Sequence, residues 1–170
     1  MNPGQKLMVE LSARQLGLNK GSPESRFTHE QEVDGIHLKL EIQDTDKYGF
    51  LVRSIAARST PLTHTTNDLK ALLTRQAAEL EKRLTYLLEN FRLLELDETK
   101  QVAQVRSHAP YRQDGAMHYY EILLAEGNAL SFARYHYRGA HSQRETEPTY
   151  ITKEALMRLV SDFAGVLRAA

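Results

Sequence analysis

The sequence predicts an α+β fold: an antiparallel β-sheet built from hairpins, packed on one face by a long central helix and a C-terminal helix. Three observations support this. Several runs alternate apolar and polar residues, two long stretches repeat apolar residues every three or four positions, and the connections between successive runs are short. Short connections join neighbouring strands as antiparallel hairpins, and helices must then cover one face of the sheet.

Residues 1–25 are predicted to be an N-terminal arm or a short helix, free to be mobile. Met8, Leu11 and Leu16 form a partial apolar stripe, and a polar loop follows it. Residues 26–170 are predicted to be a single α+β domain, because a chain of 170 residues suits one domain and can bury a core without metals or disulfides.

Residues 33–42 are the first predicted strand. Apolar residues alternate there with polar ones, which is the period of a strand with one solvated face: Ile36, Leu38, Leu40 and Ile42. A turn at residues 44–47 leads to a second predicted strand, residues 48–57, which pairs back on the first as a hairpin.

A long helix is predicted from residue 66 to about residue 90. Thr65 is a good N-cap, and Asp68 can answer it as in a capping box. At 1.5 Å per residue the helix would be roughly 37 Å long, enough to cross a whole sheet. Its apolar residues form one continuous stripe: Leu69, Leu72, Leu73, Ala77, Leu80, Leu84, Leu87, Leu88 and Phe91.

The second half of the chain is predicted to hold four more strands and the closing helix. The strands are residues 92–96, 101–107, 117–125 and 130–138, with polar loops at 107–115 and 139–149. The helix runs from about residue 152 to residue 168, with Thr152 as its N-cap. Its predicted core residues recur at helical spacing: Ala155, Leu156, Leu159, Val160, Phe163, Val166 and Leu167.

The hairpin of residues 117–138 supplies the candidate site. Gly127 and Asn128 suit a two-residue turn, because both tolerate the positive φ angles of primed turns. That turn sets a register in which three pairs share one face: Leu123 with Phe132, Glu121 with Arg134, and Tyr119 with His136. The opposite face then carries Tyr120, Ile122, Leu124, Ala133, Tyr135 and Tyr137.

We expect the first of these faces to be the solvent-facing side of the sheet and a binding surface. Apolar and aromatic residues beside arginine are typical of interfaces. The candidate binding residues are Tyr119, Glu121, Phe132, Arg134, His136, Arg138 and Arg112. The alternative is a half-solvated sheet face with one cross-strand ion pair and no binding role.

The two loops at the open end of this hairpin are a second place where chemistry could occur. Together with His118 and His136 they could bind an anion or exchange protons near neutral pH. The alternative is a pair of polar loops with no role. The loop residues in question are His108, Tyr111, Arg112, Asp114, His141, Arg144, Glu145 and Glu147.

Several functional classes are disfavoured. The chain has no cysteine, which excludes disulfides, thiolate zinc sites and a cysteine nucleophile. Its seven histidines show no metal-ligand spacing, and the nucleophile-elbow and glycine-rich nucleotide motifs are missing. We therefore predict no catalytic residues, no metal and no cofactor, and favour a protein that is not an enzyme.

Charge and hydropathy bound the location and the partners. The formal net charge is zero, which argues against a general nucleic-acid binder; that function would need a continuous basic stripe on the folded surface. No run approaches the roughly 18 apolar residues of a membrane span, and no signal peptide is recognisable, so the expected location is the cytoplasm of a bacterial cell. An acidic first half and a mildly basic second half could attract each other within one chain or between two copies.

The order of elements resembles that of small bacterial secretion chaperones, although the chain lacks their strong acidity. The resemblance implies a chaperone-like role. Our leading hypothesis is a small soluble cytoplasmic binding or adaptor module that acts through protein–protein contacts, with an unknown partner or with itself as a homodimer. In the dimer Leu72, Leu87 and Tyr86 could pack on the second copy. The alternative is a binding protein for a small anionic ligand, or a modest enzyme, that uses Tyr119, Glu121, Arg134 and His136.

Overall fold

The structure is a computed structural model that describes residues 1–16, 26–60, 68–139 and 142–168. These residues form three helices, α1 (Pro3–Leu16), α2 (Leu69–Arg83) and α3 (Lys153–Arg168). They also form ten strands: β1 (Phe27–Val33), β2 (Ile36–Thr45), β3 (Gly49–Ser59), β4 (Asn90–Asp97), β5 (Val102–His108), β6 (Tyr111–Gln113), β7 (Ala116–Ala125), β8 (Ala129–Tyr137), β9 (Glu145–Glu147) and β10 (Thr149–Thr152).

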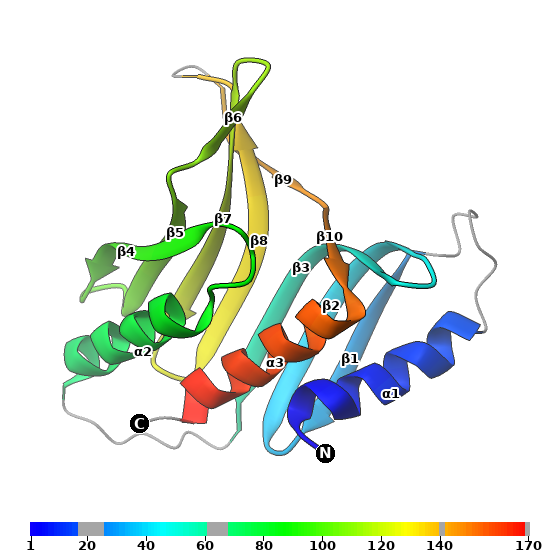
Figure 1. Cartoon of the computed structure of the whole chain (residues 1–170). Helices are drawn as coiled ribbons and strands as arrows, with labels where there is room; N and C mark the ends of the chain where they lie inside the picture. Colours follow the sequence, from blue (N-terminus) through cyan, green and yellow to red (C-terminus); the bar gives the residue numbers. More distant parts are fainter. Residues whose placement is uncertain (17–25, 61–67, 140–141, 169–170) are drawn as a thin grey trace.

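The strands make one antiparallel sheet, and the helices lie on one of its faces, which confirms the predicted fold class. The strand order is β1-β2-β3-β8-β7-β5-β4, and β10, β9 and β6 add to β3, β8 and β7. Figure 1 shows α2, α3 and α1 side by side in front of the sheet. We call the other side of the sheet the open face, because no helix of the described residues lies on it.

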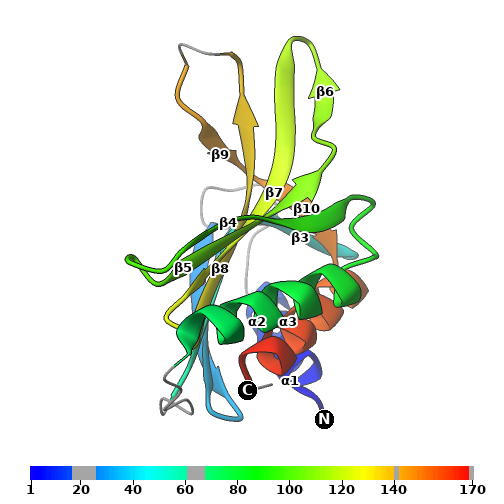
Figure 2. The same ribbon diagram turned by 90° about the vertical axis from the view of Figure 1, so that its left-hand side faces the viewer.

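One end of the sheet extends beyond the helices. The N-terminal half of β7 and the C-terminal half of β8, with β6 and β9 paired to them, rise above the helix layer (Figure 2). We call this part the arm; it comprises residues 111–120, 134–137 and 145–147. Its side chains on the helix side therefore pack on one another and on the segment that joins α2 to β4, not on a helix.

The core lies between the helices and the sheet, with α3 at its centre. Each apolar residue predicted for α3 is buried except Ala155, which is half-buried. The predicted N-cap is also confirmed, since the hydroxyl of Thr152 accepts a hydrogen bond from the backbone N–H of Ala155 at 3.2 Å. From the sheet, Phe50, Ile55 and Phe132 are almost completely buried against this layer.

Residues 1–25, predicted to be a short helix or a mobile N-terminal segment, contain helix α1, which packs on α3. Leu7 and Leu11 of α1 are fully buried. The two helices approach closely at Gly4, where a Cβ would lie 1.9 Å from the carbonyl oxygen of Met157. Only glycine fits at this contact, so α1 sits directly on the backbone of α3.

The long helix is shorter than predicted. It begins at Leu69 and ends at Arg83, and Asp68 is the N-cap whose side chain accepts a hydrogen bond from Ala71 N at 3.0 Å. The predicted cap Thr65 lies outside the described residues. Beyond the helix the predicted apolar stripe is interrupted, since Leu88 is 97% exposed, and Phe91 is buried from strand β4, not from a helix. Pairing with β5 decides this, since apolar residues at helical spacing can also be used by a turn followed by a strand.

Two edge elements were missed, and the sequence contained a signal for both. Strand β1 joins β2 through Asp34-Gly35, and β6 joins β7 through Asp114-Gly115. All four residues have positive φ, between 51° and 78°. Asp-Gly is the preferred sequence for two-residue hairpin turns of this kind. Strand β9 lies in what was predicted to be the polar loop 139–149, and β10 begins at the last residue of that loop and ends at Thr152.

The register predicted for the β7–β8 hairpin is wrong by one residue. Ala125 pairs with Ala129, so the loop has three residues, 126–128, instead of two. The positive φ angles fall on Glu126 and Gly127, and Asn128 N donates to Ala125 O at 3.2 Å. The loop also packs on its neighbours: a Cβ on Gly127 would lie 2.5 Å from Leu72 Cδ2 of α2, and Asn128 O accepts a hydrogen bond from Ser59 N at 2.8 Å. A slip of one residue moves every side chain of a strand to the other face.

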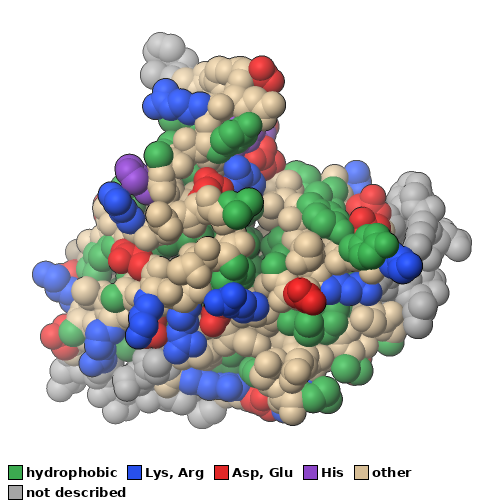
Figure 3. All heavy atoms as spheres, viewed as in Figure 1, with side chains coloured by type: hydrophobic (Ala, Val, Ile, Leu, Met, Phe, Trp, Pro, Cys, Tyr) green, Lys and Arg blue, Asp and Glu red, His purple; other side chains and the backbone are tan. Residues whose placement is uncertain are grey.

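The helix surface suggested for a dimer is used within the chain. Leu72 is fully buried, and Leu87 packs against the core. The Tyr86 hydroxyl donates a hydrogen bond to Asp162 Oδ2 at 2.8 Å. On the helix side, Lys and Arg side chains lie over α2 and α3 (Figure 3). Each helix in the described part of the chain is too short or too polar to cross a lipid bilayer.

Candidate functional site

The corrected register divides the predicted binding residues between two faces. Tyr119 and Glu121 are on the open face, as expected, but Phe132, Arg134 and His136 are on the helix side. Phe132 belongs to the core: it is 1% exposed, and its ring lies 5.4 Å from Tyr120 and 5.8 Å from Phe163, centroid to centroid. The predicted pairs of Glu121 with Arg134, Tyr119 with His136 and Leu123 with Phe132 are therefore wrong.

The remaining two predicted binding residues lie on the arm. Arg112 pairs with Met117 in the sheet, and Arg138 directly follows Tyr137, which pairs with the same methionine. Both arginines are exposed. They flank β7 on its two sides and belong to neither of the two clusters described below.

The first cluster surrounds Glu121 on the open face. Its carboxylate is only 5% exposed, although no helix covers it. The Oε2 atom accepts hydrogen bonds from Gln104 Nε2 at 2.7 Å, Arg106 Nη2 at 3.0 Å and Arg144 Nη1 at 2.7 Å. Among the described residues none donates to Oε1. The ion pair therefore joins β7 to β5 on one side and to the chain just before β9 on the other.

Two tyrosine rings complete this cluster. Tyr119 and Tyr135 face each other across β7 and β8, with ring centroids 5.9 Å apart. The Arg106 guanidinium lies 4.3 Å from the centroid of Tyr119, and that of Arg144 lies 4.1 Å from the centroid of Tyr135. Each arginine thus stacks on an aromatic face while it donates to one carboxylate, which suits a planar guanidinium. We call Gln104, Arg106, Tyr119, Glu121, Tyr135 and Arg144 the open-face cluster.

The electrostatics of the cluster favour the charged forms of Glu121 and Arg144. Burial alone would raise the pKa of the Glu121 carboxyl, but hydrogen bonds from Arg144, Gln104 and Arg106 outweigh it and lower the pKa. Burial likewise disfavours the charged form of Arg144, and its contacts with Glu121 and Tyr119 raise its pKa instead. Glu121 is therefore an ion-pairing group and not a proton donor near neutral pH.

Replacing Glu121 with glutamine should change how stability depends on pH. Because the pKa is lowered in the folded chain, the stabilisation by Glu121 is present above its usual value of 4.5 and is lost as the pH falls below that value. We expect urea unfolding to show a difference between wild type and Glu121→Gln that is largest near neutral pH and shrinks over the acid range below about pH 5. A difference that stays constant over this range would show that the carboxylate charge is not what stabilises the cluster.

A hollow of about 480 Å³ adjoins the cluster on the open face. Glu121, Tyr135 and Arg144 line it, together with residues of β2, β3, β4 and β5. Its central strands contribute small side chains, Ser54, Ser131 and Ala133, while longer charged side chains surround them. A second hollow of about 290 Å³ shares Leu123 and Ser131 with the first and continues over Ala56. The two form a shallow trough across β3, β8 and β7.

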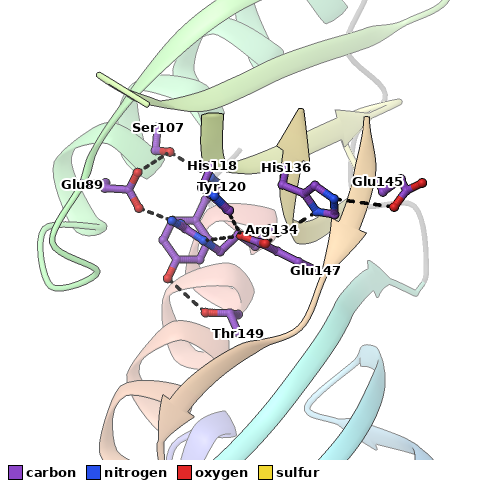
Figure 4. A network of polar contacts seen from close by, with 9 residues as sticks. All are labelled: Glu89, Ser107, His118, Tyr120, Arg134, His136, Glu145, Glu147 and Thr149. Carbon is purple, nitrogen blue, oxygen red and sulfur yellow. Dashed lines mark hydrogen bonds and ion pairs between the residues drawn. The ribbon is translucent and has the colours of Figure 1, made fainter. Parts of the chain in front are cut away.

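The second cluster lies on the helix side of the arm and centres on Arg134 (Figure 4). The guanidinium donates to Glu89 Oε2 at 2.8 Å and to Glu147 Oε1 at 3.1 Å, and it lies 4.4 Å from the centroid of Tyr120. Ser107 connects the strands beneath, because its hydroxyl accepts from Tyr120 N at 2.8 Å and donates to Glu89 at 3.3 Å. Burial lowers the pKa of Arg134, but its hydrogen bond with Glu89 and nearby negative charge raise it above the usual value.

Two histidines extend this network toward β9. His118 Nδ1 lies 2.7 Å from Glu147 Oε1, and the two ring nitrogens of His136 lie 3.6 Å from Glu147 and Glu145. Among the described residues no three His, Asp or Glu side chains are grouped as metal ligands would be. The contacts hold β9 against β8 and fix the segment after α2. We therefore assign this arm network a structural role.

Residues that the sequence did not point to complete both clusters. Arg106 lies directly opposite Glu121 in the β5–β7 pairing, and Glu89 reaches Arg134 from the segment before β4. Neither partner is close in sequence to the residue it contacts. If β5 had been placed beside β7 in the predicted sheet, the alternation of faces along both strands would have put Arg106 next to Glu121. The contact of Glu89 with Arg134 could not be predicted in this way, because the position of Glu89 depends on where α2 ends.

Comparisons of this chain with protein-family models, with curated proteins and with solved structures found no match.

Proposed function

We propose that this protein is a non-catalytic binding module whose open face docks an extended segment of a partner polypeptide. The observation that carries the proposal is the trough, an uncovered hollow of about 480 Å³ that continues into a second one of about 290 Å³. Here the middle strands carry serine and alanine, which leaves room for another chain.

The composition of the trough suits a polypeptide. Leu123 is 38% exposed where the two hollows meet, so an apolar side chain of the partner has a contact at the centre. Charged residues surround this contact, as in interfaces with an apolar centre and a polar rim. An elongated surface of this kind binds through several side chains at once and needs no deep pocket.

A small anionic ligand has less support. Two arginines line the first hollow, Arg53 and Arg144. Arg144 already donates to the buried carboxylate of Glu121, and Arg53 donates to Gln43 and Thr146, so an anion would have to compete with these contacts. The alternative site of Tyr119, Glu121, Arg134 and His136 is divided between two faces of the ribbon.

We further propose that the module works in the cytoplasm and that its partner is a different protein.

The proposal is tested with one bulky neutral substitution on each side of the molecule. Ser131 is exposed at the bottom of the trough, and Ala78 is exposed on α2. Peptides would be selected on the wild-type chain from a random nine-residue library, and their affinity would be measured for Ser131→Tyr and Ala78→Tyr. We expect binding to Ser131→Tyr to weaken at least about tenfold, or roughly 1.4 kcal/mol, and binding to Ala78→Tyr to stay unchanged.

Urea unfolding of both variants is the control, and their midpoints should match that of the wild type. Failure to select any peptide would overturn the proposal. Equal binding to Ser131→Tyr and wild type would overturn it as well, because the peptides would then dock elsewhere.

A further inference from the structure

We infer that the trough recognises a basic side chain of the docked segment, arginine above all, and that Arg144 occupies this position when no partner is bound. The inference rests on the proposed docking of a polypeptide at the open face and names the chemistry of its ligand. Three observations carry it: how Arg144 is held, which charges surround it, and what is left when it leaves.

Arg144 is held as a bound ligand would be. It comes from the connection between β8 and β9, not from the strands that form the trough. Its guanidinium stacks on Tyr135 at 4.1 Å and donates to Glu121 at 2.7 Å. An aromatic face beside a buried carboxylate is a complete receptor for a guanidinium, because the ring stacks on the guanidinium plane and the carboxylate accepts hydrogen bonds from its N–H groups.

The surrounding charge favours a cation. Without Arg144, the residues lining the hollow comprise four acids, Glu41, Glu95, Asp97 and Glu121, and two bases, Arg53 and Lys100. The opposite side of the molecule has the reverse balance, since the three helices together contain nine basic and five acidic residues. A basic side chain is therefore attracted to the first hollow and repelled from the helix face. The second hollow is lined by Lys39 and Arg58 and by no acid, so the preference for a cation belongs to the part of the trough around Glu121.

Departure of Arg144 leaves a site that is still intact. The Arg144 side chain is 39% exposed, whereas that of Glu121 is 5% exposed. Glu121 keeps its hydrogen bonds from Gln104 and Arg106, so the carboxylate stays fixed in place. An arginine of the partner can then take the same contacts with Glu121 and Tyr135. Lysine carries the same charge, but it lacks a planar group that stacks on an aromatic ring and the forked N–H groups that donate in parallel, so it should bind less well.

The experiment removes the Arg144 side chain and measures the binding of two matched peptides. The probes are an end-capped nine-residue peptide of alanine, serine and threonine with one central arginine, and the same peptide with central citrulline, which has the same shape without the charge. The proteins are wild type, Arg144→Ala and Arg144→Gln, with Arg75→Ala as the control. Arg75 is exposed on α2, so its removal changes the net charge equally but leaves the trough untouched. Dissociation constants would be measured by NMR titration.

We expect the arginine peptide to bind Arg144→Ala and Arg144→Gln at least about fivefold more tightly than wild type, because removing an internal competitor raises the fraction of open sites. Arg75→Ala should bind as wild type does, and the citrulline peptide should lose most of the affinity for every protein. Equal affinity for the arginine and citrulline peptides would overturn the inference. Binding to Arg144→Ala that is unchanged or weaker would overturn it too, since Arg144 would then be no competitor.

These outcomes are separable from failure of the proposed docking. If the selected library peptides bind wild type and lose affinity for Ser131→Tyr while arginine and citrulline peptides behave alike, the open face docks a polypeptide and the arginine inference is wrong. If the library yields no peptide and the arginine peptide binds none of the proteins, both are wrong.

Discussion

Replacing Phe132 with alanine should lower the free energy of unfolding by about 3–5 kcal/mol, the range for a buried phenylalanine whose removal leaves a cavity. The ring is 1% exposed and lies between Tyr120 of β7 and Phe163 of α3. It therefore joins the sheet to the central helix. The same residue was predicted from the sequence to be on the binding face, where its removal would leave stability almost unchanged and reduce only binding.

Urea unfolding distinguishes these two placements. Leu123→Ala is the control, because Leu123 is the apolar residue that the corrected register leaves on the open face, 38% exposed. We expect Leu123→Ala to lower the free energy of unfolding by less than about 1 kcal/mol. Equal, small losses for Phe132→Ala and Leu123→Ala would show that both side chains are at the surface and that the observed register is wrong.

Replacing Arg134 with leucine should lower the free energy of unfolding by about 2–4 kcal/mol, slightly below the cost of breaking a fully buried ion pair. The Arg134 and Glu89 side chains are 14% and 15% exposed, and the change leaves the carboxylates of Glu89 and Glu147 without their common partner.

The control for this substitution is Arg92→Leu. Arg92 is exposed on strand β4, and surface changes of this kind stay within about 0.5 kcal/mol. Unfolding of both variants would be followed by circular dichroism in urea. Similar values for Arg134→Leu and Arg92→Leu would mean that the arm network does not hold β9 and the segment after α2.

Local patterns predicted most of the fold. Alternation in residues 33–42 placed β2, and the helical stripe with its Thr152 cap placed α3 within a residue. These elements follow from period and capping alone, so one chain segment contains all the necessary information. The strands β1 and β6 were missed although Asp-Gly marks both turns.

The register of the site hairpin could not be obtained in this way. A two-residue turn at Gly127-Asn128 is sound locally, but the positive φ angles fall on Glu126 and Gly127, and glutamate is a residue that sequence reasoning does not place at positive φ. The position of the turn decides which face Phe132, Arg134 and His136 occupy. Tyr119 and Glu121 were placed together correctly because both belong to β7, where no register is needed.

The central claim is that the open face of the sheet receives a polypeptide, and backbone amide shifts test it most directly. The ¹⁵N-labelled wild-type chain would be titrated with a peptide selected from the nine-residue library. The account predicts that the largest shifts fall on Ser54, Leu123 and Ser131 and their neighbours on β3, β7 and β8, and that the exposed side of α2 stays unperturbed. Shifts concentrated on α2, or on the arm around His118 and His136, would contradict it.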